Sequence, residues 1–208
     1  AQLLPGFGLA LVHAAAVGDA NGMALLTGYG GSGKSTTALA CHRQGLTVLG
    51  DDYVAVDTRP RPGRRPRVHA LYASVKVVPC ELRGETPSAS TGGKAVLYPL
   101  AGSHGPVLQS APLMGFHRLR LGTGPACHWQ AAHPDDVARI AAASSNLQLP
   151  TGDDAGLEQR LRNLAHAIGN SAELWLGSDR RQVPAAVREG LRPRQQAGQG
   201  GNGRPPRG

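Results

Sequence analysis

A glycine-rich segment that ends in a lysine and two hydroxyl residues is the part of this sequence best suited to chemistry. It reads Gly28-Tyr29-Gly30-Gly31-Ser32-Gly33-Lys34-Ser35-Thr36 and contains the pattern G-x-x-x-x-G-K-[ST]. Glycines let backbone N–H groups turn towards phosphate oxygens without a clash from Cβ. Lys34 can then reach the β- and γ-phosphates of a nucleotide, and the Ser35 hydroxyl can bind Mg²⁺. The segment therefore predicts a phosphate-binding loop (P-loop) for ATP and Mg²⁺.

The residues on either side of this loop are those that a P-loop requires. The apolar run 23–27 before it predicts a strand, and the small and straight-chain residues after it predict a helix over 33–44. A helix that begins at Gly33 adds the positive end of its dipole to the phosphate site. The alternative is a glycine-rich surface turn that matches the motif by chance, and the strand and helix flanks favour the P-loop.

Two adjacent carboxylates, Asp51 and Asp52, follow the next predicted strand, residues 46–49. A P-loop needs a carboxylate at the end of a neighbouring strand to complete its Mg²⁺ site. Because side chains alternate along a strand, one of the two can face the metal while the other faces an incoming acceptor. The pair could instead be a solvated acidic turn, but its place after the P-loop helix favours a functional role.

The order of a histidine, the P-loop and an aspartate pair resembles the catalytic core of HPr kinase/phosphorylase and of the shorter HPr-kinase-like serine kinases. His13 lies fifteen residues before Gly28, and Asp51 and Asp52 lie seventeen and eighteen residues after Lys34. The segments LVHAAAV, LLTGYGGSGKSTTALA and GLTVLGDDYVAV carry the resemblance, which is specific over residues 13–52. Beyond about residue 85, the sequence resembles only the short kinase-like proteins as a group.

The resemblance implies a role for each matching residue. Asp52 would be the base that takes the proton from a serine hydroxyl, Asp51 would lie near the metal with Ser35, and His13 would lie beside the site. The implied activity is ATP- and Mg²⁺-dependent transfer of the γ-phosphate to a serine of a small protein or peptide. The loop that carries phosphorylase activity in the larger enzymes has no convincing counterpart, so the reverse reaction is not expected. Glu81, which opens the segment ELRG, echoes a metal-site glutamate of those enzymes.

The lysines give a clue that is independent of any family. The sequence contains nineteen arginines but only three lysines, Lys34, Lys76 and Lys94. Lys34 belongs to the P-loop, so the other two are candidates for contacting phosphate or an acidic substrate as point charges. Lys76, in the apolar strand-like segment YASVKVV, favours function, whereas Lys94 is equally well explained as an exposed surface lysine.

We expect a single α/β domain over residues 1–191, with an HPr-kinase-like P-loop core, a mixed sheet, the P-loop helix and C-terminal helices. Further strands are predicted at 7–18, 53–57, 68–78, 95–100, 113–121 and 172–176, and helices at 134–143, 155–168 and 184–191. Segment 58–67 is predicted to be a mobile Pro/Arg loop, 87–93 a Ser/Thr/Gly loop, and 192–208 a disordered basic tail.

Composition and charge limit the partners. The net charge is +8, but nine arginines fall in 58–67 and in the tail, so the rest of the chain is nearly balanced and nucleic acid is not an expected partner. An acidic partner of the loop or tail stays open. No apolar run approaches the ~20 residues that cross a bilayer. Three separated cysteines and an N-terminus without Met or a basic n-region favour a cytoplasmic protein without a signal peptide.

Two other function classes remain open. The chain could be a nucleotide-binding switch or regulatory module with slow ATP hydrolysis, or it could be a small-molecule kinase or a related carboxykinase-like lyase. A guanine-reading N-K-x-D motif does not occur in the sequence, which argues against a GTPase. The larger family forms hexamers, so the resemblance implies that the chain can form a homo-oligomer.

Overall fold

The computed structural model describes residues 4–19, 21–59, 63–72, 74–82, 87, 89–97, 108–148 and 153–192. The strands are β1 Leu9–Val12, β2 Ala14–Asp19, β3 Gly22–Thr27, β4 Thr47–Gly50, β5 Val54–Asp57, β6 Arg67–Ala70, β7 Val75–Val77, β8 Ala89–Thr91, β9 Lys94–Leu97, β10 Ser110–Leu121, β11 His128–Ala131 and β12 Ser171–Leu176. The α-helices are α1 Lys34–Arg43, α2 Pro134–Gln148, α3 Asp154–Ile168 and α4 Val183–Gly190, with short 3-10 turns η1 Leu4–Phe7, η2 Pro79–Glu81 and η3 Arg180–Gln182.

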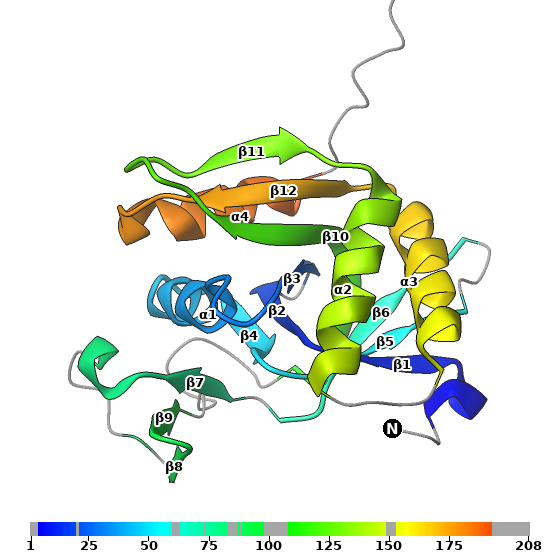
Figure 1. Cartoon of the computed structure of the whole chain (residues 1–208), viewed down its shortest axis with the longest axis horizontal. Coiled ribbons are helices and arrows are strands. Elements are labelled where there is room, and N and C mark those ends of the chain that lie inside the picture. The colour runs from blue at the N-terminus through cyan, green and yellow to red at the C-terminus, as the bar shows by residue number, and fades with distance from the viewer. Residues whose placement is uncertain are drawn as a thin grey trace, which may run out of the picture.

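A mixed sheet of nine strands forms the centre of the molecule. Seven of them follow the order β1-β5-β6-β10-β3-β2-β4, while β12 pairs with both β10 and β11. The P-loop strand β3 pairs parallel with β10 and antiparallel with β2, and β12 runs parallel to β10. A second sheet of three short strands, β7-β9-β8, lies apart from the first (Figure 1). The α/β class and the mixed sheet expected from the sequence are confirmed.

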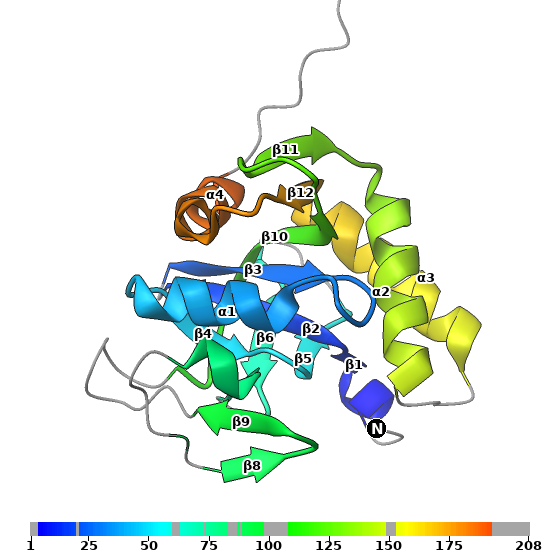
Figure 2. The same ribbon diagram turned by 60° about the vertical axis from the view of Figure 1, so that its left-hand side comes forward.

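Helices cover both faces of the large sheet (Figures 1 and 2). Helices α2 and α3 pack against one face around Phe116 and Leu161, and α1 and α4 pack against the other around Leu26 and Leu39. The six residues of β3 are all buried, because this strand lies between two neighbours and under helices on both sides. Burying the P-loop strand in this way fixes the position of the loop that follows it.

The single strand predicted over residues 7–18 is instead two strands that meet at His13. Strand β1 pairs with β5, whereas β2 pairs with β3 and β4. The physical reason is that the N–H of His13 does not join a sheet ladder but donates to the Ser145 hydroxyl of α2, at 2.9 Å. Side chains nonetheless alternate between the two faces across the break, since Ala10 and Ala14 lie in one core cluster and Ala15 in the other.

The loop predicted at 87–93 is wrong in part, because Ala89–Thr91 form β8 and pair with β9. Gly92 and Gly93 connect the two strands with φ of 55° and 74°. Two consecutive residues with positive φ are the requirement of a tight type I′ hairpin, which glycine meets without strain. Strand β11 was not predicted either; it pairs along β12 only, and its side chains are largely exposed.

The remaining predicted elements appear, with shifted ends. Helix α1 ends at Arg43, and Gly45 follows with φ 79°, as a glycine after a helix end commonly does. The predicted strand 68–78 is divided between β6 and β7, which lie in different sheets. The Pro/Arg loop is described at 58–59 and 63–67 only, with β6 beginning at Arg67, and the predicted tail falls almost wholly outside the described residues. Among the described residues, no helix is long and apolar enough to cross a membrane.

Candidate active site

The P-loop has the geometry that its sequence predicts. It leaves the end of β3, and α1 begins at Lys34 directly after it. Gly31 and Gly33 have φ of 80° and 95°, a region that other residues adopt only with strain. A Cβ added to Gly33 would lie 2.7 Å from Leu176 Cδ1, so this glycine also allows the sheet to pack closely against the loop.

Lys34 folds back over the loop that it follows. Its ammonium group donates to the carbonyl oxygens of Gly28, at 2.6 Å, and Tyr29, at 3.1 Å. The side chain is almost fully buried, and this burial lowers the pKa of Lys34 to about 8, although Asp52 and Asp51 act to raise it. A buried ammonium group that has little contact with water forms a strong charge-assisted hydrogen bond to a phosphate oxygen. Lys34 is therefore well placed to bind a phosphate group.

The two aspartates after β4 occupy different environments. Asp51 is 2% exposed, and its Oδ2 accepts a hydrogen bond from the Lys76 N–H at 2.8 Å. Its Oδ1 is buried and makes no hydrogen bond of standard geometry to any described residue. Burial raises the pKa of Asp51 to about 6, against the lowering effect of the Lys76 N–H and the Ser35 hydroxyl.

The surroundings of Asp51 and Ser35 are suited to Mg²⁺. An unsatisfied buried carboxylate oxygen beside a P-loop serine is the donor set that Mg²⁺ takes when substrate phosphates and waters complete its shell. The described residues contain no group of three His, Cys, Asp or Glu side chains that could hold a metal by themselves. The residues present therefore fit a metal that depends on a bound nucleotide, held by Ser35 and Asp51.

Asp52 points away from Asp51 and towards two basic groups. Its Oδ2 accepts from the Lys76 ammonium group at 2.5 Å, and its Oδ1 lies 3.5 Å from His13 Nε2. The Asp52 side chain is 28% exposed, so an acceptor molecule can approach it. The two carboxylates face different ways, as expected from the sequence, but they do so because Asp51 and Asp52 form a bend after β4, not because a strand continues through them.

His13 is oriented by a chain of buried hydrogen bonds. The Ser144 hydroxyl donates to the Gly28 carbonyl at 2.9 Å, so its oxygen accepts from His13 Nδ1–H, at 2.8 Å. This places a proton on His13 Nδ1 and directs Nε2 towards Asp52. Burial, followed by the charge of Lys34, lowers the pKa of His13. The imidazole is therefore a neutral proton acceptor placed behind the carboxylate.

A cavity of about 480 Å³ joins these groups. Its lining residues are His13, Gly30, Gly31, Ser32, Gly33, Lys34, Ser35, Thr36, Asp51, Asp52, Lys76, Gly92, Lys94 and Gln148. The small sheet supplies Lys76 from β7 and Lys94 from β9, and the end of α2 supplies Gln148. All three lysines of the sequence line this one cavity, so the two outside the P-loop lie where they could contact a bound phosphate.

Three predicted residues lie elsewhere or take part only through the backbone. Gly28 and Tyr29 do not line the cavity, but their carbonyl oxygens hold Lys34, and the Tyr29 ring is 43% exposed. Glu81 also lies outside it, in an ion pair with Arg180, and its carbonyl oxygen accepts from Arg43. Glu81, at the end of η2, thus packs beside α1, and its side chain meets the cavity wall through the Thr36 hydroxyl, which lies 3.5 Å from Glu81 Oε1.

Sequence reasoning missed the residues of α2 that complete the site. Ser144 and Ser145 are buried on a helix whose inward face is otherwise apolar. Two adjacent serines in an alanine-rich helix are a weak signal, since either hydroxyl could simply donate to a backbone carbonyl oxygen one turn earlier, as Ser145 does to Ala141. Their partner His13 is more than 130 residues away, as the separations of 132 and 131 positions show.

The fold and the cavity together define an α/β P-loop protein with a carboxylate pair beside its phosphate site. No model of a known protein family matches the sequence. A search of curated proteins finds no match either. Among solved structures, the chain is similar to the structure of the Hpr(Ser) kinase/phosphatase from Coxiella burnetii, with a TM-score of 0.42 and 10% identity over 88% of this chain and 93% of that one.

Proposed function

We propose that this protein is an ATP- and Mg²⁺-dependent kinase that transfers the γ-phosphate to a serine hydroxyl of a small protein or peptide. The observation that carries the proposal is Asp52, a partly exposed carboxylate between Lys76 and the neutral His13, on the wall of the cavity that the P-loop opens into. A hydroxyl acceptor needs such a base within hydrogen-bond reach. The similarity of residues 13–52 to the HPr-kinase-like core agrees with this reading.

In the proposed reaction, the serine oxygen attacks the γ-phosphorus in line, the bond to the ADP oxygen breaks, and the serine proton passes to Asp52. His13 Nε2 lies 3.5 Å from Asp52 and can share that proton. Lys34 leaves the Gly28 and Tyr29 carbonyl oxygens and follows the charge that develops on the phosphoryl group. Ser35 and Asp51 would hold Mg²⁺, which would supply charge neutralisation at the phosphates.

The test is phosphorylation of a serine-containing peptide library with γ-labelled ATP, followed by localisation of the label by mass spectrometry. Lys34→Ala should lower transfer about 10²–10³-fold, as loss of one positioned donor usually does. Arg139→Ala is the matched control, because Arg139 is exposed on α2 and pairs with Asp136. Full activity of Lys34→Ala would disprove the P-loop assignment.

The same experiment separates the other function classes. Release of free phosphate at a steady rate, with no label on any peptide, would favour the regulatory module with slow ATP hydrolysis. Label that appears only on small hydroxyl compounds would favour a small-molecule kinase. Either result would leave ATP binding at the P-loop intact and would overturn the serine acceptor.

A further inference from the structure

A second pocket, of about 210 Å³, lies at the opposite end of strands β1 and β5 from the catalytic cavity. Its lining residues are Phe7, Gly8, Asp57, Arg59, Arg64, Arg65, Pro66 and Arg67. We call it the arginine pocket. Four guanidinium groups and one carboxylate give its lining a net charge of +3. Such a surface attracts acidic ligands.

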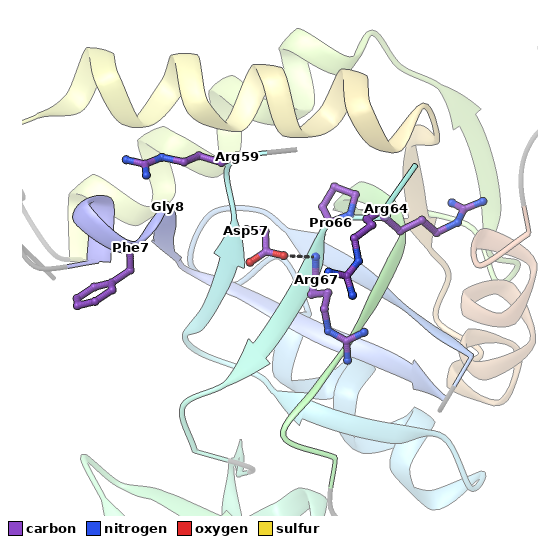
Figure 3. Close-up of a pocket in the computed structure, with 8 residues that line it drawn as sticks. Phe7, Gly8, Asp57, Arg59, Arg64, Pro66 and Arg67 are labelled. Atoms are coloured by element: carbon purple, nitrogen blue, oxygen red, sulfur yellow. Dashed lines mark hydrogen bonds between the residues drawn. The ribbon is translucent and has the colours of Figure 1, made fainter. Parts of the chain in front are cut away.

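The one carboxylate of the pocket is already occupied. Asp57 Oδ2 accepts from the Arg67 N–H at 3.0 Å, and its Oδ1 lies 3.2 Å from His69 Nε2. Asp57 therefore shapes the backbone where β6 begins and satisfies both of its oxygens there. Figure 3 shows Arg59 on one side of Asp57 and Arg64 and Arg67 on the other. Because Asp57 is engaged in these two contacts, the arginines determine the positive charge of the pocket.

The arginine at the start of β6, Arg67, is held by its surroundings. The Arg67 guanidinium donates to the hydroxyl and the carbonyl oxygen of Ser110, at 2.8 and 2.9 Å from Nη2 and 3.2 Å from Nε. Arg59 Cδ lies beside Gly8, where an added Cβ would come within 2.9 Å of it. A guanidinium group that is already held, as that of Arg67 is, loses little conformational freedom when it binds an anion. Arg67 thus differs from an arginine of a loop that is merely solvated.

The location of the pocket suggests which ligand it serves. Edge strand β1 leads from Gly8, in the pocket, to His13, in the catalytic cavity. At about 3.3 Å per residue, these five steps span roughly 16 Å. An extended peptide with a serine at Asp52 therefore reaches the pocket with a side chain about five residues away.

We propose that the arginine pocket binds carboxylate or phosphate groups of an acidic segment in the acceptor polypeptide, about five residues from the serine that is phosphorylated. This inference rests on the proposed kinase function for the role of the segment, but not for its binding. Arginine is suited to this task because its planar fork can bind a carboxylate or phosphate with two parallel hydrogen bonds. The pocket would thus select substrates, while the P-loop cavity performs the transfer.

The test measures binding without ATP, so that it does not depend on catalysis. Fluorescent peptides carry one serine and either four glutamates or four glutamines centred five residues before or after it. We expect the better glutamate peptide to bind at least tenfold more tightly than its glutamine counterpart, and 0.5 M NaCl to weaken it because exposed charges are screened. Equal binding of the glutamate and glutamine peptides would overturn the proposal.

Charge reversal locates the site. Arg64→Glu with Arg65→Glu should lower glutamate-peptide affinity about tenfold, since each exposed pair changes affinity by about two- to fivefold and repulsion replaces attraction. Arg181→Glu with Arg192→Glu is the matched control, with the same change in charge at exposed residues of η3 and of the segment after α4. The neutral variant Arg64→Gln with Arg65→Gln controls for misfolding caused by charge reversal. It should show a smaller loss of glutamate-peptide affinity. Unchanged affinity in the reversal variant, or an equal loss in the control, would overturn the proposal.

Two competitors identify the occupant. A single-stranded oligonucleotide that binds more tightly than the glutamate peptide, and loses binding in the reversal variant, would make the pocket a nucleic-acid site and overturn the polypeptide. Inorganic phosphate that displaces the peptide at submillimolar concentration would make it a site for a free anion. If the glutamate and glutamine peptides are phosphorylated with the same KM, the kinase proposal is supported and the docking proposal is overturned. If the glutamate peptide binds selectively but no serine is labelled, the docking proposal is supported and the kinase proposal is overturned.

Discussion

Burial of Asp51 has a calculable effect on stability, because its carboxylate loses water and gains only one full hydrogen bond. Burial raises the pKa of Asp51 from 3.8 to about 6. At about 1.4 kcal/mol for each factor of ten, the ionised carboxylate weakens the fold by roughly 3 kcal/mol at pH well above 6. Replacing it by Asn keeps the shape and the bond from the Lys76 N–H but removes the charge. We therefore predict that Asp51→Asn is more stable than the wild type at pH 7.5.

The sign of the pH dependence follows from the direction of this shift. Between pH 3.8 and about 6 the folded state binds more protons at Asp51 than the unfolded state, so wild-type stability falls as pH rises through this window. Above about pH 6, burial of the ionised Asp51 carboxylate lowers the free energy of unfolding by its full amount. The advantage of Asp51→Asn should thus grow by roughly 2 kcal/mol between pH 4.5 and 7.5, and this growth does not depend on how well the amide itself is accommodated.

Urea unfolding followed by tryptophan fluorescence at several pH values measures the difference directly. A second series adds a non-hydrolysable ATP analogue with Mg²⁺, which should stabilise the wild type more than Asp51→Asn, because a hard cation favours a charged oxygen ligand. Asp52→Asn, at a more exposed carboxylate, is the matched control for removing one negative charge beside the P-loop. A stability difference between Asp51→Asn and wild type that is constant with pH would refute the reasoning about burial.

Three further predictions concern the catalytic groups. Asp52→Asn should retain binding of ATP and Mg²⁺ in a calorimetric titration but lose transfer by ~10²–10⁴-fold, the usual contribution of a general base. Ser144→Ala removes the hydrogen bond that orients His13, so kcat should fall and its pH profile should change, while Ser144→Thr should restore both. Gly33→Ala should weaken ATP binding and lower the free energy of unfolding by about 1 kcal/mol or more, because φ is 95° and the new Cβ would lie 2.7 Å from Leu176; a stable variant with normal ATP affinity would contradict it.

The sequence predicts best where the chemistry is local. Strand β3, the P-loop and α1 are consecutive, and each has its own signal in an apolar run, a glycine pattern or a helix-favouring segment. Asp51 and Asp52 face different sides, as strand alternation predicts, although both lie in the bend that follows β4. Composition predicts the importance of two lysines for another reason. Most basic residues of this chain are arginines, so Lys76 and Lys94 are exceptions, and both line the cavity.

What the sequence does not show depends on contacts between distant segments. His13 looks like one residue of a continuous strand, and only the Ser145 hydroxyl, 132 positions away, explains why the strand breaks there. The hairpin at 89–97 was missed for a different reason. Its two glycines, Gly92 and Gly93, are a recognisable turn signal, but the surrounding Ser and Thr residues suggested a loop.

Lys76 connects the small sheet to both aspartates. This double contact explains how the adjacent residues Asp51 and Asp52 can supply one buried and one exposed carboxylate. Its backbone N–H holds Asp51 Oδ2, and its ammonium group holds Asp52 Oδ2. The first contact belongs to the backbone of β7 and any residue except proline could make it, while the second needs a flexible point charge. The hydrogen bond to Asp52 raises the pKa of Lys76, so this ammonium group stays charged while Asp52 is ionised. Strand β7 thus fixes the buried carboxylate through its main chain and the exposed one through its side chain, and the two carboxylates can differ in chemistry although they are neighbours in sequence.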